Sequence, residues 1–184
     1  MVKRLFSVIA AVAVAFSIVV FAPVAASAAN PYCGITWGSG TKSTGWSEAG
    51  LLRDVRGGQH ECFDRLVIDL DAPGGHGYYV NYVDEITADG SGHVIPTRGA
   101  GKLQIVARGR AYDDNGQLTY HPANWDELVN VAGWRTFRQV VFAGTFEGDT
   151  TIGIGLRARL PFRVFTLPRD NGGTRIVVDV AHLW

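Results

Sequence analysis

The sequence predicts an all-β protein, a β-sandwich of short and mostly antiparallel strands with at most one short helix. From about residue 63 onward, short segments follow one another in which apolar and polar residues alternate. Clusters of Gly, Pro, Asn and Asp separate these segments, as turns do. Only one helix start signal occurs in the same region. Many short strands with hardly any helix are typical of a sandwich or a barrel.

Residues 1–28 are predicted to be a secretory signal peptide. Lys3 and Arg4 form a positive start, residues 5–21 are an uninterrupted apolar run, and Ala26-Ser27-Ala28 is a cleavage site of small residues. Because the apolar run is slightly long for a signal, an uncleaved N-terminal anchor is the alternative. We expect the remaining chain of about 155 residues to be secreted, extracellular or wall-associated, without a membrane span, and to form one domain.

Residues 29–60 are expected to form a loop-rich N-terminal arm with room for one short strand. They are rich in Gly, Ser and Thr and show no sustained period. The two cysteines of the chain, Cys33 and Cys62, both lie in the exported part, where an even pair predicts one disulfide. This bond would tie the arm beside the first strand of the domain that follows.

The strands of that domain are predicted from their alternating patterns. They cover residues 63–70, 77–86, 102–111, 136–146, 151–160, 162–167 and 175–180, and residues 93–96 are ambiguous. Turns are expected at 71–75, 89–92, 113–116 and 170–173, and Pro161 ends the fifth strand. Asn115-Gly116 favours the positive φ angles of a tight hairpin. Asn124, with Glu127 three residues later, is a capping box that predicts one short helix.

One pattern occurs twice, as RLVIDL at residues 65–70 and as RIVVDV at residues 175–180. In each copy the alternation of a strand places the aliphatic residues on one face and the Arg and Asp on the other. Arg and Asp four residues apart along a strand are too distant to pair, so we expect their partners on neighbouring strands. The two copies are interpreted as central strands related by an internal pseudo-symmetry. Chance convergence of two β-rich segments is the alternative.

The sequence contains no motif that indicates catalysis, a metal or a cofactor. H-E-x-x-H, G-x-S-x-G and Walker patterns are absent, and residues 113–116 lack the closing Glu of a calcium loop. The histidines occur singly, at His60, His76, His93, His121 and His182. We therefore expect a protein that is not an enzyme, with a hydrolase or zinc amidase site assembled from distant residues as the alternative. Because 17 basic residues balance 17 acidic ones, no nucleic acid partner is expected.

Two groups of residues are candidates for ligand binding. The first is a basic strand face, which would suit carboxylates or phosphates if its members converge; the alternative is a solvated face paired with cross-strand Asp and Glu. The second is a set of aromatic residues in Gly-rich surroundings, whose flat rings suit the apolar face of a sugar or cover a small core. The candidates are Lys102, Arg108, Arg110, Arg157 and Arg159, together with Trp37, Trp46 and Tyr79.

An ordered set of segments resembles the AMIN-like domain proteins that actinobacteria secrete. The segments are DRLVID at 64–69, GYYVNYV at 77–83, GTFEG at 144–148, GIGL at 153–156, PFRV at 161–164 and RIVVDV at 175–180. The resemblance spans about residues 62–182 and implies a β-sandwich domain over 61–184. The AMIN domain lies beside cell-wall amidases and in secretins, where it targets its host to peptidoglycan or the envelope. The resemblance therefore implies non-catalytic binding to a cell-wall glycan or peptide.

The chain departs from the typical arrangement because it carries no amidase or pore module to be targeted. The resemblance assigns no binding residues. The alternative function is a secreted protein–protein interaction module, such as an inhibitor or an accessory subunit that contacts an envelope protein. Such a module would present a contiguous apolar patch instead of a basic groove.

Overall fold

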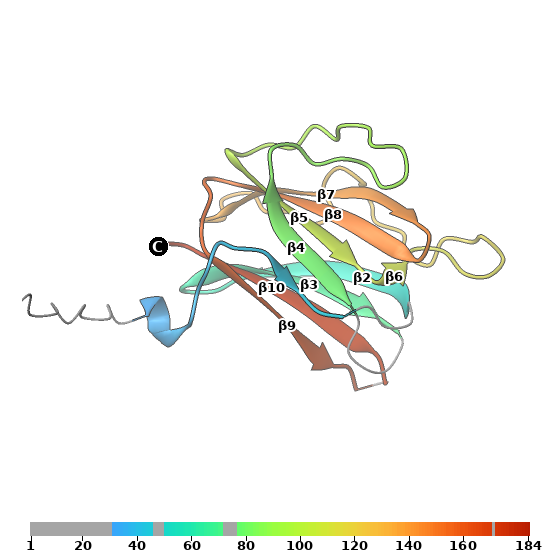
Figure 1. Ribbon diagram of the computed structural model, residues 1–184, viewed down its shortest axis with the longest axis horizontal. Coiled ribbons are helices and arrows are strands. Elements are labelled where there is room, and N and C mark those ends of the chain that lie inside the picture. Colours follow the sequence, from blue (N-terminus) through green and yellow to red (C-terminus); the bar gives the residue numbers. More distant parts are fainter. Residues whose placement is uncertain (1–30, 46–49, 72–76, 171) are drawn as a thin grey trace, which may run out of the picture.

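Two sheets face each other (Figure 1), with the main apolar core between them; Ile86, Val141 and Ala143 form a second, smaller buried cluster. The computed structural model describes residues 31–45, 50–71, 77–170 and 172–184. The predicted signal peptide and Trp46 lie outside the described residues. Within those ranges the fold is a β-sandwich of mostly antiparallel strands, as the sequence predicted.

The strands divide evenly between the two sheets over the described residues. The β5–β8 sheet has the order β1 (Lys42–Ser43), β4 (Tyr78–Val83), β5 (Gly101–Ala107), β8 (Asp149–Leu156) and β7 (Phe137–Phe146). The β3–β10 sheet has the order β6 (Gly109–Arg110), β2 (Gly50–Gln59), β3 (Phe63–Leu70), β10 (Thr174–Ala181) and β9 (Phe162–Pro168). Neighbouring strands run antiparallel except β2 and β6, which are parallel.

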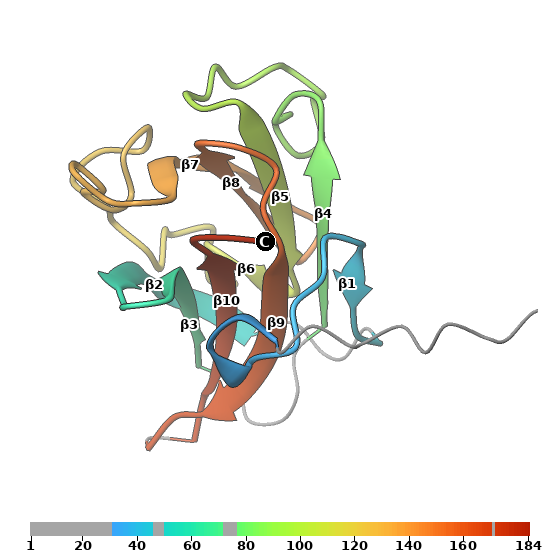
Figure 2. The same cartoon turned by 90° about the vertical axis from the view of Figure 1, so that its left-hand side faces the viewer.

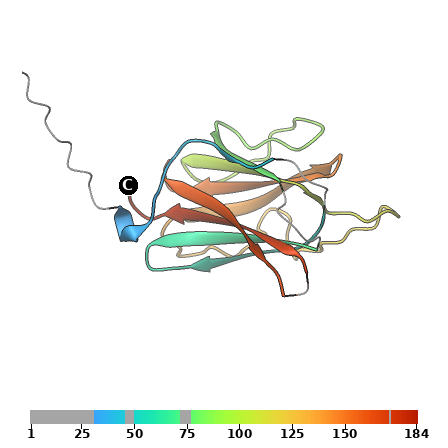
Figure 3. The same ribbon diagram turned by 60° about the horizontal axis from the view of Figure 1, so that its bottom comes forward.

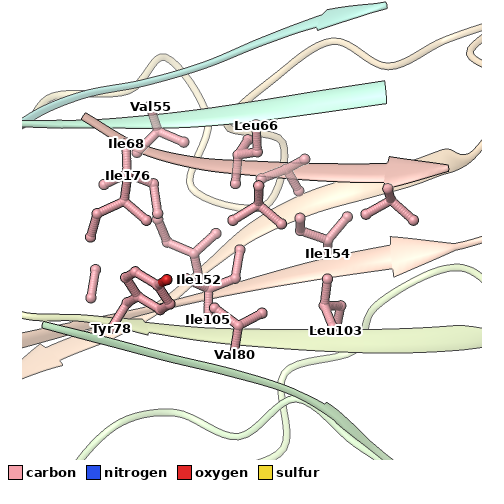
Figure 4. Packing of buried hydrophobic residues seen from close by; sticks show 14 of the residues in the cluster. Val55, Leu66, Ile68, Tyr78, Val80, Leu103, Ile105, Ile152, Ile154 and Ile176 are labelled. Atoms are coloured by element: carbon pink, nitrogen blue, oxygen red, sulfur yellow. The ribbon is translucent and has the colours of Figure 1, made fainter. Parts of the chain in front are cut away.

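The core is formed by the inward faces of the two sheets. Leu66 and Ile68 of β3 and Ile176 of β10 are fully buried, and so are Ile105 of β5 and Ile152 of β8 (Figure 4). These residues occupy alternate positions of their strands, because only every second side chain of a strand reaches the same face. The alternation read from the sequence therefore identifies the buried faces of the central strands.

The repeated pattern forms the centre of the β3–β10 sheet. β3 and β10 are adjacent and antiparallel, and Val67 lies opposite Val177. Around this pair Arg65 lies opposite Asp179, and Asp69 lies opposite Arg175. Each copy thus supplies the cross-strand partners of the other, which confirms the predicted central strands and gives the strand pair a local two-fold pseudo-symmetry.

Several predicted elements differ in the structure. The strand predicted over 151–160 is β8, which ends at Leu156, before Pro161. Residues 50–59 form the long strand β2, where the sequence predicted a loop-rich arm. The sequence did not predict this strand, because Gly57 and its polar neighbours break the alternation. A Cβ at Gly57 would lie 3.1 Å from Trp134, which packs against the strand.

The predicted helix after Asn124 is absent from the described residues, whose only helical element is the 3-10 turn η1 (Tyr32–Gly34). The Asn124 side chain instead accepts the Asp126 N–H at 2.9 Å in a local turn.

The predicted strand 102–111 changes sheets along its length. It pairs with β4 and β8 as β5, and after Arg108 it pairs with β2 of the opposite sheet as β6. Gly109 permits this crossing, because a Cβ there would lie 2.5 Å from the Leu70 side chain.

The N-terminal arm connects the two sheets at one side of the sandwich. The predicted disulfide between Cys33 and Cys62 is present and holds η1 next to β3. The arm then bridges the start of β9 at Gly38 and adds β1 to the edge of β4 (Figure 2). The η1 turn and the C-terminus lie at the same end of the sandwich, opposite the hairpin of residues 111–118 (Figure 3).

Among the described residues, no helix has the length and apolarity needed to cross a membrane.

Candidate functional site

The residues of the predicted basic strand face lie at two opposite ends of β8. Arg108 pairs with Asp149, the first residue of β8, at 3.1 Å. Lys102 lies opposite Gly155, near the last residue of β8. Six residues of strand separate these positions, which is about 20 Å. The structure therefore separates Arg108 from Lys102, and of the predicted basic residues it places Lys102 and Arg159 together, in the lining of a small pocket of about 290 Å³.

Each of the remaining basic candidates has its own local partner. Arg110 pairs with Asp114 of the neighbouring hairpin. Arg157 donates to the carbonyl oxygen of His182, and Arg159 donates to that of Ser39 at 3.3 Å. These contacts hold loops to the sandwich and do not form a shared anion site.

Tyr79 and Tyr82 of β4 point to opposite faces of the sheet, because side chains alternate along a strand. Tyr79 is 41% exposed on the outward face of the β5–β8 sheet. Tyr82 packs against the core, where its hydroxyl donates to the Leu160 carbonyl at 2.6 Å and accepts the Leu160 N–H at 2.9 Å. Burial raises the pKa of Tyr82 to about 12, so the hydroxyl remains a neutral donor. Tyr82 is therefore a structural residue.

A network of arginines around two aspartates covers the outward face of the β3–β10 sheet. Asp179 is fully buried and accepts from Arg65 at 2.6 Å and Arg163 at 2.8 Å. Asp69 is buried as well and lies within pairing distance of three further arginines. We call this surface the arginine face and define it by Arg56, Arg65, Arg163, Arg169, Arg175, Asp69 and Asp179.

The arginine face has an excess of positive charge. Within the described part of the chain, five guanidinium groups of the face share two carboxylates. The carboxylates are buried, whereas the arginines remain partly exposed, with Arg56 at 48% and Arg175 at 30%. Arg169 and Arg175 also donate to the carbonyl oxygens of Leu70 and Pro168, each at 3.1 Å, but a guanidinium has more N–H donors than these contacts use, and it has no acceptor. The arrangement can therefore bind carboxylates or phosphates from solvent.

Aromatic rings hold two of these guanidinium groups in place. The Cζ atom of Arg163 lies 5.0 Å from the ring centroid of Phe165 and 5.6 Å from that of Trp37. Arg65 lies 5.1 Å from the centroid of Phe63. Such cation–π contacts add to the salt bridges and fix the planes of the guanidinium groups. A shallow depression of about 450 Å³ lies over the same face, between Arg56, Arg65 and Arg175.

An aromatic cleft adjoins the arginine face at the end of the sandwich where η1 and the C-terminus meet. It has a volume of about 530 Å³ and is lined by Pro31, Tyr32, Ile35, Thr36, Trp37, Pro161 and Trp184. Trp37 belongs to the cleft and also contacts Arg163 of the arginine face. Trp37 was a sequence candidate, whereas Trp184 was not.

A buried His–Asp pair lies near the disulfide and serves the fold. The Nε2 atom of His182 lies 2.9 Å from the carboxylate of Asp64, and its Nδ1 atom lies 3.1 Å from the Glu61 carbonyl. The other Asp64 oxygen accepts the N–H groups of Thr136 and Phe137 at 2.7 and 2.9 Å. Both ring nitrogens are thus engaged by the protein. In the ranges that the structure describes, no three His, Cys, Asp or Glu residues are grouped as metal ligands.

Comparison with known proteins assigns the chain to a family. The sequence model of the AMIN-like domain family matches residues 50–182. The matched segment includes β2 to β10 and all five arginines of the arginine face. No curated protein and no solved structure shows significant similarity to the chain. Tyr32, Trp37 and Trp184 of the aromatic cleft lie outside the matched segment. Because the match covers most of the sequence, the chain belongs to the AMIN-like domain family.

Proposed function

We propose that the protein is a non-catalytic module that binds an anionic polymer of the cell wall, peptidoglycan foremost, through the arginine face. Membership in the AMIN-like family indicates an envelope-associated domain. The observation that carries the proposal is the arrangement of five partly exposed arginines around two buried aspartates. The peptides of peptidoglycan end in carboxylates, and the guanidinium fork binds such groups with two parallel hydrogen bonds.

The aspartates make the arginine face rigid. Without them, five neighbouring guanidinium groups would repel one another and spread into solvent. Asp69 and Asp179 neutralise part of that charge from below and leave the outer N–H groups directed by fixed salt bridges. A rigid array loses less side-chain entropy on binding than flexible lysines would lose. The face is therefore suited to binding a repetitive anionic polymer.

Binding to purified peptidoglycan sacculi tests the proposal. The mature protein is mixed with sacculi and pelleted, and the bound fraction is measured against sacculus concentration. The double variant Arg56→Gln/Arg175→Gln removes two partly exposed charges and leaves Arg169 beside Asp69. Loss of two charge-assisted hydrogen bonds should weaken binding by about tenfold or more.

The matched control is Arg108→Gln, which removes a charge from the basic strand face that the sequence suggested. Its binding should equal that of the wild type, and the melting temperatures of all variants should show that they are folded. Normal binding by the double variant, together with weaker binding by Arg108→Gln, would assign the contact to the basic strand face and refute the arginine face.

A protein–protein interaction module is less well supported by the surface. The exposed large apolar side chains of the described residues come from many separate segments, among them Tyr79, Val94, Leu118, Phe146 and Leu167. Trp184 lines the aromatic cleft, which a small ligand can fill, and Leu183 is its exposed neighbour in sequence. An interaction module would be expected to gather such residues into one larger patch.

A further inference from the structure

We propose that the aromatic cleft binds a pyranose ring of an acidic glycan, and that Arg163 binds a carboxylate carried by that sugar. This inference rests on the proposed function and names the part of the polymer that the protein recognises. It adds a second contact to the arginine face, one that depends on ring stacking more than on charge.

The walls of the cleft are held rigidly although they are open to solvent. Trp184 is 70% exposed, yet its indole N–H donates to the Arg159 carbonyl at 3.1 Å. The indole N–H of Trp37 donates to the Tyr32 carbonyl at 2.8 Å. Tyr32 belongs to η1, which the disulfide of Cys33 ties to β3. Large exposed rings that are held in place in this way lose little conformational freedom when a ligand binds.

The chemistry of the cleft favours a sugar. The indole N–H groups are engaged by backbone carbonyls, so a ligand in the cleft contacts the carbon surface of the rings instead. Flat aromatic faces suit the C–H face of a pyranose ring, whose hydroxyl groups can remain in solvent at the rim. The volume of about 530 Å³ lies within the range of ordinary small-ligand pockets.

The charge beside the cleft favours an acidic sugar over a neutral one. The guanidinium of Arg163 lies against the ring of Trp37, at 5.6 Å from its centroid. Its salt bridge to Asp179 engages Nε, so the two terminal nitrogens are not required by that carboxylate. A sugar stacked in the cleft with a carboxylate on one substituent would place that carboxylate toward Arg163. This continuity of charge and aromatic surface selects an acidic glycan as the occupant.

Titration calorimetry with soluble probes tests the inference. The main probe is a disaccharide–tripeptide muropeptide, in which the peptide substituent on one pyranose ring supplies the carboxylates. Chitotetraose supplies similar rings without carboxylates, and the free tripeptide supplies carboxylates without rings. We expect the muropeptide to bind at least about tenfold more tightly than either partial probe, because only it fills both the cleft and the Arg163 position.

Substitutions at Trp184 and at Arg163 separate the contributions. Trp184→Ala should weaken muropeptide binding by about tenfold, Trp184→Phe should restore much of the affinity, and the neighbouring Leu183→Ala should bind as the wild type does. Arg163→Lys retains a cation beside Asp179 but loses the planar fork, so it should reduce the preference for muropeptide over chitotetraose.

The inference is overturned if Trp184→Ala binds the muropeptide within twofold of the wild type, if a partial probe binds as tightly as the muropeptide, or if no muropeptide binds. In each of these cases the sacculus experiment decides separately on the proposed function. Sacculus binding that depends on Arg56 and Arg175 would leave the arginine face intact while the cleft is rejected. Wild-type protein that fails to bind sacculi at all would refute the proposed function itself.

Discussion

At the scale of single residues, the buried carboxylate of Asp179 illustrates how the arginine face and the fold depend on each other. It has no exposed surface and accepts from Arg65 and Arg163. Replacement by Asn keeps the shape but leaves two half-buried guanidinium groups without their counter-charge. We expect Asp179→Asn to lower the free energy of unfolding at pH 7 by about 3 kcal/mol.

Urea unfolding measures this effect, and Asp71→Asn is the matched control. Asp71 also pairs with an arginine, Arg53 at 2.5 Å, but both side chains are more exposed than Asp179. Its replacement should cost less than about 1 kcal/mol. Equal losses in the two variants would show that burial of the Asp179 pair contributes nothing special to stability.

Asp89 provides a residue-scale prediction about pH. Burial raises the pKa of its carboxyl; the Gly90 N–H lowers it, and the charges of Asp149 and Glu147 raise it again, with a net rise. Because the folded-state pKa lies above the unfolded value, ionised Asp89 destabilises the fold at neutral pH. This destabilisation disappears as the pH falls below both pKa values.

We therefore expect Asp89→Asn to be more stable than the wild type at pH 7, by a fraction of a kcal/mol after solvent screening. The two proteins should approach equal stability near pH 3, where the wild-type carboxyl is protonated as well. Thermal melting at both pH values measures the difference. A gain of the same size at pH 3 would assign it to shape or hydrogen bonding and not to charge.

At the scale of elements, β8 has no room for side chains at its glycines. A Cβ at Gly155 would lie 1.7 Å from the carbonyl oxygen of Arg98, which is backbone and cannot rotate away. The Arg98 segment is tied down in turn, since its N–H donates to Gln139 at 2.7 Å. Gly155→Ala should therefore lower the free energy of unfolding by about 3 kcal/mol or more.

Gly40→Ala is the control for this prediction, because no atom lies within 4 Å of a Cβ at Gly40. It should leave the stability unchanged or raise it slightly, through a smaller entropy of the unfolded chain. Chemical unfolding of both variants compares them directly. A mild effect at Gly155 would mean that the 97–99 segment moves more readily than its hydrogen bonds suggest.

The elements also show how far the sequence can predict this protein. Alternation identified the central strands, and the repeated pattern predicted that each Arg and Asp would find its partner on a neighbouring strand. It did not identify which strands are neighbours. Arg163 comes from β9 and Arg56 from β2, and both join the repeat only through the sheet order. β2 itself escaped prediction because Gly57 accommodates a ring from a distant loop.

For the basic strand face, the sequence pattern grouped residues that the structure separates. Lys102 and Arg108 were grouped because they occur in one alternating segment. Residues that lie far apart along an extended strand are, however, also far apart in space. Arg108 lies level with the start of β8 and Lys102 with its end. The aromatic cleft could not be predicted, because Tyr32 and Trp184 come from the two ends of the described chain and meet only through the disulfide and the final strand.

At the scale of the whole molecule, charge is balanced in total but unevenly distributed. The full sequence has a formal charge of zero, whereas the arginine face has five guanidinium groups and two carboxylates. A neutral protein has no long-range attraction to a polyanion, so the proposed contact with a wall polymer depends on this local excess. Local attraction of this kind is strongly screened by salt, because the Debye length falls from about 10 Å at 0.1 M to about 3 Å at 1 M.

We therefore expect sacculus binding to weaken by about tenfold or more between 0.1 and 1 M NaCl. The Arg56→Gln/Arg175→Gln variant should start lower and show a shallower dependence on salt, since it has lost charges that salt would screen. Trp184→Ala should lower binding at every salt concentration with the slope of the wild type, because stacking in the aromatic cleft is not a charge interaction. If wild-type binding resists salt, the main contact is the aromatic cleft and not the arginine face. If the arginine variant and the wild type show the same dependence on salt, Arg56 and Arg175 are not part of the interface.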